Sequence, residues 1–228
     1  MIERSIATTT HGRYLVVPPA AAQPAGLLVG FHGYAEGAET QLERLRAIPG
    51  SDRWWLLAIQ GLHRFYQRRT NEVIASWMTR QDRELAIADN LAYVEAVLDA
   101  VSREKPALAQ SRDSERRRLV LAGFSQGVAM AFRAACATAH HIDGVIAVGG
   151  DVPPEIDPAS LARVHTALVC RGARDVWYTA EKFQQDVARI RQAGAAVQPV
   201  AFDGGHEWSA PVVESASTFL RDLTDQKQ

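Results

Sequence analysis

A serine flanked by glycines is the first candidate for chemistry in this chain. The sequence Gly123-Phe-Ser125-Gln-Gly127 follows an apolar run, Leu119 to Ala122, and precedes the small and apolar residues 128–131. The apolar run is typical of a strand buried on both faces, and the small residues are typical of the start of a buried helix. In such a strand-to-helix turn the serine hydroxyl projects from the sheet edge, and glycines leave room for neighbouring backbone. We therefore expect Ser125 to be a nucleophile, with a turn serine or helix N-cap as the alternative.

A nucleophilic serine needs a base and an acid, and candidates for both occur later in the chain. A serine hydroxyl requires a histidine base, which in turn requires an acid that orients it. Asp175 and His206 each follow a predicted strand, in the order serine, acid, histidine. Because the carboxyl ends of parallel strands meet at one sheet edge, we predict that Ser125, Asp175 and His206 lie together. Asp151 also follows a strand and is the rival acid; Asp175 as a helix N-cap is the other alternative.

The same chemistry needs hydrogen-bond donors for an oxyanion. One donor is expected from the residue after the nucleophile and the other from a loop after an early strand. These are the backbone N–H groups of Gln126 and Tyr34, since His32-Gly33-Tyr34 directly follows the predicted strand Leu27–Phe31. We expect the His32 ring to be buried and to support this loop rather than to act on a substrate.

At these residues the chain resembles the phospholipase/carboxylesterase family of serine α/β-hydrolases, which includes acyl-protein thioesterases. The resemblance spans nearly the whole chain and rests on four segments: Phe31-His-Gly33, Gly123-Phe-Ser125-Gln-Gly127-Val-Ala-Met, Gly172 to Asp175, and Gly205-His206-Glu207. It implies a compact enzyme, without a cap domain, that acts on carboxylic esters or thioesters. It also implies Ser125, Asp175 and His206 as a triad, with Tyr34 and Gln126 as the oxyanion hole. The family pattern His-Gly-Leu-Gly-Asp is replaced here by His32-Gly-Tyr-Ala-Glu36, which weakens the expectation of long-chain thioester specificity.

The surrounding pattern predicts elements that can position these residues. Apolar strands alternate with amphipathic helices, which is typical of a mostly parallel sheet with helices on both faces. The predicted strands after the first are Trp54–Ile59, Leu119–Ala122, Gly144–Val148, Ala167–Cys170 and Val197–Phe202. Predicted helices carry apolar stripes at Leu42, Leu45 and Ile48, from Glu84 to about Val101, after Ser125, at Phe183, Val187 and Ile190, and from a Ser209 cap to Leu223. We expect the α/β-hydrolase fold, with no large cap, as one domain over residues 1–228.

Other segments fall outside this alternation. Ile2 to Thr9 and Arg13 to Val17 are predicted to pair as an antiparallel hairpin. Gln60 to Arg83 has no clear period and follows a strand, so we expect loops there near a ligand. Ser111 to Arg118 mixes Arg with Asp and Glu, which is typical of a solvated loop.

Aromatic residues near the predicted carboxyl-edge loops are candidates for a substrate pocket. They are Phe65, Tyr66, Trp77, Trp177 and Trp208, of which we expect about half to line the site and the rest to belong to the core. Few residues remain for a lid, so soluble esters of short-to-medium acyl chains are favoured over lipid aggregates. A thioesterase, lactonase or small peptidase would use the same residues. A non-catalytic protein that binds a small ligand with this fold is the alternative from another class.

Composition excludes several partners. The formal charge of the 228 residues is −1, so there is no long-range attraction to nucleic acid or an anionic membrane. The chain has no signal-like start and no apolar run of membrane length, so we expect a cytoplasmic protein. Cys136 and Cys170 lie in apolar surroundings and are predicted to be reduced thiols. The adjacent His140 and His141 point apart, so no metal and no other cofactor is expected. The oligomeric state is left open, a homodimer included.

Overall fold

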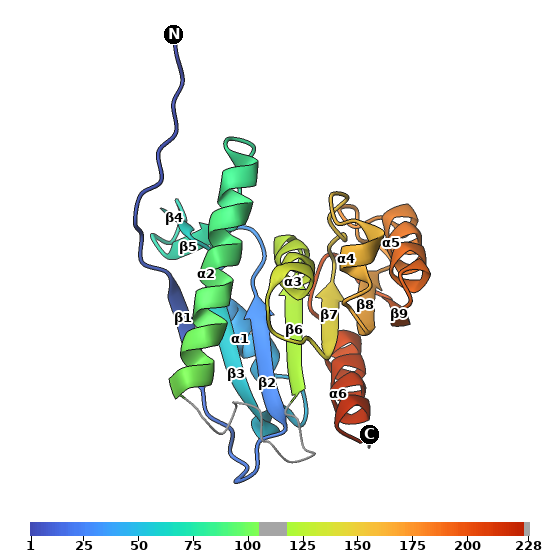
Figure 1. The fold of residues 1–228 in the computed structure, drawn as a ribbon. Helices are drawn as coiled ribbons and strands as arrows, with labels where there is room; N and C mark the ends of the chain where they lie inside the picture. Colours follow the sequence, from blue (N-terminus) through green and yellow to red (C-terminus); the bar gives the residue numbers. More distant parts are fainter. Residues whose placement is uncertain (105–117, 226–228) are drawn as a thin grey trace.

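A computed structural model describes residues 1–104 and 118–225 of the chain. At its centre is a seven-stranded sheet (Figure 1). The edge strand β1 is antiparallel to its neighbour β3, and every other neighbouring pair is parallel. In spatial order the strands are β1 (Arg13–Val17), β3 (Trp54–Gln60), β2 (Gly26–Phe31), β6 (Arg118–Phe124), β7 (Gly144–Val148), β8 (Thr166–Gly172) and β9 (Ala196–Phe202).

Helices cover both faces of the sheet (Figure 1). On one face lie α1 (Ala38–Arg46) and α6 (Ala210–Asp225), which share one buried apolar cluster. A second cluster lies under α2 (Arg83–Glu104), α3 (Gln126–Ala137), α4 (Pro158–Leu161) and α5 (Ala180–Gln192). A short 3-10 helix, η1 (Ser51–Arg53), precedes β3. This arrangement confirms the predicted mostly parallel sheet with helices on both faces. Over the described residues, no helix is long and apolar enough to cross a membrane.

The apolar run of β6 shows how the sheet uses its sequence. Leu121 belongs to the cluster beneath α2 and α3, whereas Val120 and Ala122 belong to the cluster beneath α1 and α6. Successive side chains of a strand point to opposite faces, so a strand covered on both sides needs apolar residues at every position. The prediction of a strand buried on both faces is confirmed.

The predicted hairpin at the beginning of the chain is wrong. Residues 1–12 contain no strand and are all exposed, and β1 pairs instead with β3. After Met1, Ile2 and Ile6 are the large apolar side chains of this segment, and both are exposed. Burying so little apolar surface cannot offset the entropy lost on ordering a strand.

The segment 60–83 contains a hairpin that the sequence did not predict. Its strands are β4 (His63–Tyr66) and β5 (Val73–Ser76), which form a separate two-stranded sheet. All residues of β4 are exposed, so no alternation of apolar and polar residues marks it as a strand. Of the predicted solvated loop Ser111 to Arg118, residues 111–117 lie outside the described residues, and Arg118 is the first residue of β6.

The last helix begins where it was predicted but without the predicted cap. Pro211 lies in the first turn of α6, as expected. Within the described part of the chain, however, the buried Ser209 hydroxyl has no hydrogen-bond partner, and it is the Ser209 carbonyl that accepts the N–H groups of Val212 and Val213. The Ser209 side chain therefore does not cap α6. The preceding helix α5 is capped by Thr179, whose side chain accepts the N–H of Lys182, so the alternative of Asp175 as its N-cap is also wrong.

Asn90 provides a test of how α2 is joined to the loop after β5. Its amide is fully buried and donates to the carbonyls of Trp77 and Ala86, both at 2.8 Å. Asn90→Ala is expected to lower the free energy of unfolding by about 2 kcal/mol, because it leaves the Trp77 carbonyl buried without this donor. Urea denaturation measures the change. Asp89→Ala, at the exposed next position, is the control; an equal loss in both variants would contradict the assignment.

Candidate active site

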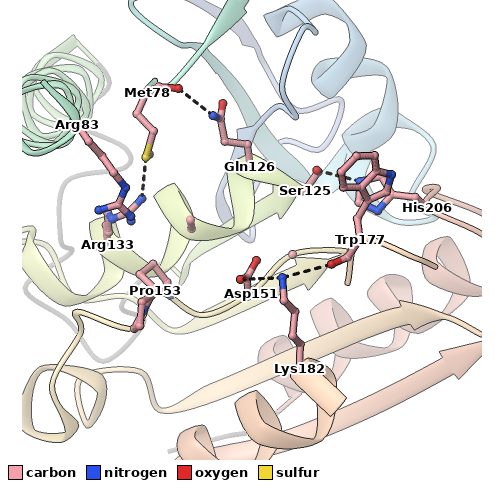
Figure 2. A pocket seen from close by; sticks show the side chains of 14 residues that line it. Met78, Arg83, Ser125, Gln126, Arg133, Asp151, Pro153, Trp177, Lys182 and His206 are labelled. Atoms are coloured by element: carbon pink, nitrogen blue, oxygen red, sulfur yellow. Dashed lines mark hydrogen bonds and ion pairs between the residues drawn. The ribbon is translucent and has the colours of Figure 1, made fainter. Parts of the chain in front are cut away.

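The side chains of Ser125, Asp175 and His206 meet at the carboxyl edge of the parallel sheet. Ser125 lies between β6 and α3, Asp175 follows β8, and His206 follows β9. His206 Nε2 lies 2.9 Å from the Ser125 hydroxyl, and His206 Nδ1 lies 2.8 Å from Asp175 Oδ2. Figure 2 shows the imidazole beside the serine. The residues predicted to lie together therefore form one continuous chain of hydrogen bonds.

Asp175 is held as the partner of His206 by its own backbone neighbours. Its side chain is buried, and Oδ1 accepts the N–H groups of Trp177 at 2.9 Å and Tyr178 at 3.0 Å. These donors orient the carboxylate and leave Oδ2 facing the imidazole. The rival Asp151 forms an ion pair with Lys182 at 3.5 Å instead. The geometry thus favours Asp175 over Asp151.

The turn that carries Ser125 has a strained backbone. Ser125 has φ 51° and ψ −118°, a conformation that non-glycine residues rarely adopt. Its N–H donates to the Val148 carbonyl at 2.9 Å, which fixes the turn against β7. A Cβ atom at Gly127 would lie 2.1 Å from the carbonyl oxygen of Phe31, so the beginning of α3 contacts the end of β2 at a distance that only glycine permits.

His32 supports the loop after β2, as the sequence predicted. The ring is fully buried and stacks on Trp77 with centroids 5.0 Å apart. Nε2 accepts the N–H of Gly61 at 2.9 Å, so the ring proton is on Nδ1, which donates to the Gly33 carbonyl at 2.6 Å. Burial lowers the pKa of His32, which keeps the ring neutral and able to accept from Gly61.

These contacts fix the direction of the Tyr34 N–H. The Gly33 carbonyl and the Tyr34 N–H belong to one planar peptide unit, so holding the carbonyl also orients the N–H. The preceding N–H, that of Gly33, donates to Glu36 Oε2 at 2.7 Å. Arg44 binds both oxygens of Glu36, at 2.6 and 2.7 Å. Two consecutive peptide units of the loop are therefore fixed by side chains.

Glu36 and Arg44 are residues that the sequence analysis did not assign to the site. Burial raises the pKa of Glu36, but the hydrogen bonds and charge of Arg44 outweigh it, so the net shift is downward and the carboxylate stays ionised. The Arg44 guanidinium also lies 4.0 Å from the centroid of the Phe124 ring, and that ring lies 5.1 Å from the ring of His206. The signal in the sequence was the unusual Glu36 itself, but its partner could not be read from spacing.

The Gln126 side chain ties the beginning of α3 to the segment after β5. Its Oε1 accepts the N–H of Trp77 at 3.0 Å and the hydroxyl of Ser76 at 3.2 Å, and its Nε2 donates to the Met78 carbonyl at 3.2 Å. Both the oxygen and the nitrogen of the Gln126 amide are therefore hydrogen-bonded within the protein. The residue that follows Ser125 is fixed by its side chain as well as by the helix.

A cavity of about 290 Å³ opens beside Ser125 and His206 (Figure 2). Of the aromatic residues predicted to line a substrate site, Trp177 lies on this cavity and is 73% exposed.

The other aromatic residues proposed for the pocket lie elsewhere. The prediction for Trp77 is wrong: it is fully buried, and its indole N–H donates to the His32 carbonyl at 2.9 Å, so it belongs to the core. Phe65 and Tyr66 lie on the exposed strand β4, and Phe65 contacts the ring of Tyr34. Trp208 packs against the apolar cluster beneath α6.

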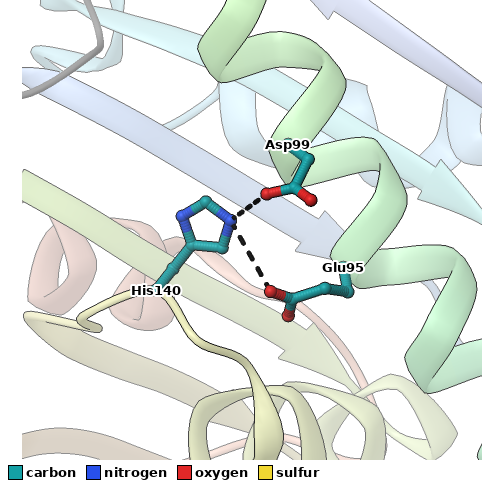
Figure 3. Close-up of side chains that lie close together, drawn as sticks. All are labelled: Glu95, Asp99 and His140. Atoms are coloured by element: carbon teal, nitrogen blue, oxygen red, sulfur yellow. Dashed lines mark hydrogen bonds and ion pairs between the residues drawn. The ribbon is translucent and has the colours of Figure 1, made fainter.

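One cluster of metal-type ligands lies elsewhere, at the end of α3. Glu95 and Asp99 of α2 approach His140, with ligand atoms within 4.8 Å of one another (Figure 3). His140 Nε2 lies 3.1 Å from Asp99, and Glu95 accepts the N–H of Ala139. The ion pair and hydrogen bonds account for these contacts, which join α2 to the turn after α3. The cluster is separated from Ser125 by the length of α3, about 18 Å.

Both cysteines are free thiols, as the sequence predicted. Burial raises the pKa of Cys136 to about 11 and that of Cys170 to about 12. A thiol with so high a pKa is a poor nucleophile at neutral pH. Neither cysteine competes with Ser125 for that role.

Comparison with known proteins identifies the family of the chain. A model of the phospholipase/carboxylesterase family matches residues 73–224, about two thirds of the sequence. The chain belongs to that family. Among curated proteins no match was found.

Solved structures of esterases share the fold of this family member. Esterase PE8 is 19% identical, with a TM-score of 0.69 over 94% of this chain and 100% of its own. The Bacillus cereus carboxylesterase is 14% identical, with a TM-score of 0.72 over 93% and 94%. Acyl-protein thioesterase 2 of Zea mays is 16% identical, with a TM-score of 0.70 over 94% and 100%. At these identities the likeness is one of fold.

The backbone strain at Ser125 can be measured by comparing the free energies of unfolding of two variants. Ser125→Gly is expected to raise the free energy of unfolding by about 1 kcal/mol over Ser125→Ala, because glycine adopts this backbone conformation without a steric cost. Alanine is the matched control, since it removes the same hydroxyl but keeps the Cβ. Denaturant unfolding of the two variants gives the difference, and equal stabilities would contradict a strained turn.

The buried neutral His32 predicts a pH dependence of stability. As the pH falls below about 6.5, the unfolded chain takes up a proton at His32 before the folded chain does. The contribution of His32 to the free energy of unfolding is therefore fully present above this pH and is lost as the pH falls below it. The protein is thus expected to become less stable toward acid pH. In His32→Phe the decrease in the free energy of unfolding between pH 7.5 and 5 should be smaller than in the wild type, although the variant is less stable overall. Urea denaturation at both pH values tests this; parallel losses would contradict it.

Proposed function

We propose that this protein is a serine hydrolase that cleaves carboxylic esters through an acyl-enzyme on Ser125. The observation that carries the proposal is the hydrogen-bond chain from Asp175 through His206 to Ser125, next to an open cavity. His206 takes the proton of Ser125 as the hydroxyl attacks the acyl carbon. Asp175 holds the imidazole in the required tautomer and stabilises the imidazolium that forms. Membership of the family supports ester hydrolysis as the reaction class.

In this mechanism the backbone N–H groups of Gln126 and Tyr34 hold the oxyanion. The Gln126 N–H belongs to the first turn of α3, where helical N–H groups have no intrahelical acceptor and the helix dipole favours negative charge. The Tyr34 N–H is oriented in advance because His32 holds its peptide unit. Donors fixed before the reaction stabilise the transition state without reorganisation. His206 then protonates the leaving group and activates the water that releases the acid.

The cavity supports small substrates. Its volume of about 290 Å³ is suited to short-to-medium acyl chains, with Trp177 beside them. A thioester, lactone or small peptide bond is open to the same attack, so the ester is proposed as the main substrate and these as alternatives. The cytoplasmic location stays a prediction from the sequence.

Labelling with a fluorophosphonate probe, followed by mapping of the modified residue, tests the mechanism. We expect the label on Ser125, together with turnover of p-nitrophenyl esters from acetate to octanoate. Ser125→Ala should lose the label and lower kcat at least about a thousandfold without changing the circular dichroism spectrum. A folded wild type that is neither labelled nor active on any chain length would contradict the proposal. Tight binding of a metabolite would then favour the non-catalytic binding protein.

The two candidate acids can be separated by mutation. Asp175→Asn removes the acceptor that holds Nδ1–H and is expected to lower kcat about 10²–10⁴-fold. Asp151→Asn changes charge in the same way but affects a carboxylate that pairs with Lys182. Steady-state kinetics on p-nitrophenyl butyrate should show a loss at least about a hundredfold larger for Asp175→Asn. A larger loss for Asp151→Asn would overturn the assignment.

A further inference from the structure

The cavity beside Ser125 and His206 carries more positive than negative charge. Arg83, Arg133 and Lys182 line it together with Asp151 (Figure 2). Glu155 lies next to the two arginines and forms ion pairs with both. Counting only residues that the structure describes, three cations therefore lie beside two carboxylates, which leaves one positive charge in excess. A neutral ester gives no reason for such a lining.

Arg133 has a side chain that is almost fully buried and not fully paired. It is 4% exposed, and its Nε and Nη2 donate to one and the same oxygen of Glu155, at 2.9 and 2.5 Å. Among the described residues, Nη1 contacts the sulfur of Met78 at 3.6 Å, and a thioether is a weak acceptor. A guanidinium has five N–H donors and cannot lose its charge in a protein. Arg133 lines the cavity, and among the described residues its Nη1 has no stronger acceptor than this sulfur.

The helix α3 places this guanidinium at a useful distance from the nucleophile. Gln126, Ala129 and Arg133 lie on one face of the helix, and all three line the cavity. Arg133 is eight positions after Ser125, which corresponds to about 12 Å between the Cα atoms along the axis. Because helical side chains lean toward the N-terminus, we expect the Arg133 side chain to extend along the helix in the direction of Ser125. It contacts Glu155 and Met78, the latter on the cavity wall. The remaining space suits a short carbon chain between the scissile carbonyl and an anion.

The wall that carries Glu155 is fixed before any ligand binds. Arg189 donates to the carbonyls of Val152, Pro153 and Ile156, and Asp186 accepts the Val152 N–H at 3.0 Å. Charges on a preordered wall lose little entropy when a ligand binds. On the other side of the cavity, Lys182 is about half exposed and pairs with Asp151, so solvent screening weakens it. Arg133, with Arg83 beside it, is the stronger site for an anion.

We propose that the preferred substrates are esters that carry a carboxylate a few carbon atoms from the scissile carbonyl, bound by Arg133 with help from Arg83. The inference rests on the esterase function proposed above and names its substrate class. The carboxylate would bond to Nη1 of Arg133 while the ester carbonyl lies at Ser125. A neutral substrate of the same shape would lose that charge-assisted hydrogen bond.

Matched pairs of esters test the proposal on the wild-type protein. Monoethyl adipate carries the carboxylate on the acyl side, and ethyl hexanoate replaces it by a methyl group. 5-Acetoxypentanoate carries it on the leaving-group side, and pentyl acetate is its neutral match. We expect kcat/KM to be at least about tenfold higher for the charged member of one pair, and that pair identifies the side. The preference should decrease as NaCl screens the charges.

Variants then assign the preference to Arg133. Arg133→Met is expected to lower the ratio of charged to neutral kcat/KM about tenfold or more, and Arg133→Lys to retain part of it. Arg191→Met, in the exposed last turn of α5, removes the same charge and should leave the ratio unchanged. An unchanged ratio in a folded Arg133→Met would overturn the assignment.

The wild-type comparison keeps the proposal testable if the Arg133 variants fail to fold. Equal hydrolysis of both members of each pair, or preference for the neutral ones, would overturn the substrate class while leaving the esterase intact. Failure of the esterase proposal has a different result: no ester of either pair is hydrolysed, and the fluorophosphonate does not label Ser125.

Discussion

The contact between the beginning of α3 and the end of β2 constrains the rest of the site. Because Gly127 lies against the Phe31 carbonyl, the turn that carries Ser125 and the loop His32-Gly33-Tyr34 occupy fixed places relative to each other. A side chain at Gly127 would separate them. The hydrogen bonds of His32 and Glu36 then set the directions of the peptide units in the loop. The backbone contact thus sets the distance between the nucleophile and the loop of the proposed oxyanion donor Tyr34, and the side chains of His32 and Glu36 orient the peptide units of that loop.

The elements with strong local signals could be predicted from the sequence. Runs such as Leu119–Ala122 are apolar at every position because the sheet is covered on both faces. This pattern does not depend on which helix packs against which face. The meeting of Ser125, Asp175 and His206 followed from chain order, since parallel strands bring their carboxyl ends to one edge. The strand β4 gave no such signal, because all its residues are exposed and its order comes from pairing with β5.

The lining of the cavity could not be predicted, because it depends on partners from other elements. Trp77 and Trp177 were equal candidates, yet a hydrogen bond to the His32 carbonyl fixes Trp77 in the core while Trp177 remains exposed. Arg133 lies in a helix whose sequence indicates burial, and its partner Glu155 belongs to the segment after β7. Pairing of charges across such separations is set by the tertiary structure. Residue type and periodicity therefore do not show which charged residues pair.

The exposure of Trp177 has a practical consequence. The chain has five tryptophans. Trp77 and Trp54 are buried, Trp55 and Trp208 are half-buried, and Trp177 stands in solvent at the rim of the cavity. Indole fluorescence depends on the polarity around the ring, so we expect a molecule that enters beside Ser125 to change the emission of Trp177 more than that of the four less exposed tryptophans. The protein thus contains an optical reporter of its own occupancy and needs no added dye.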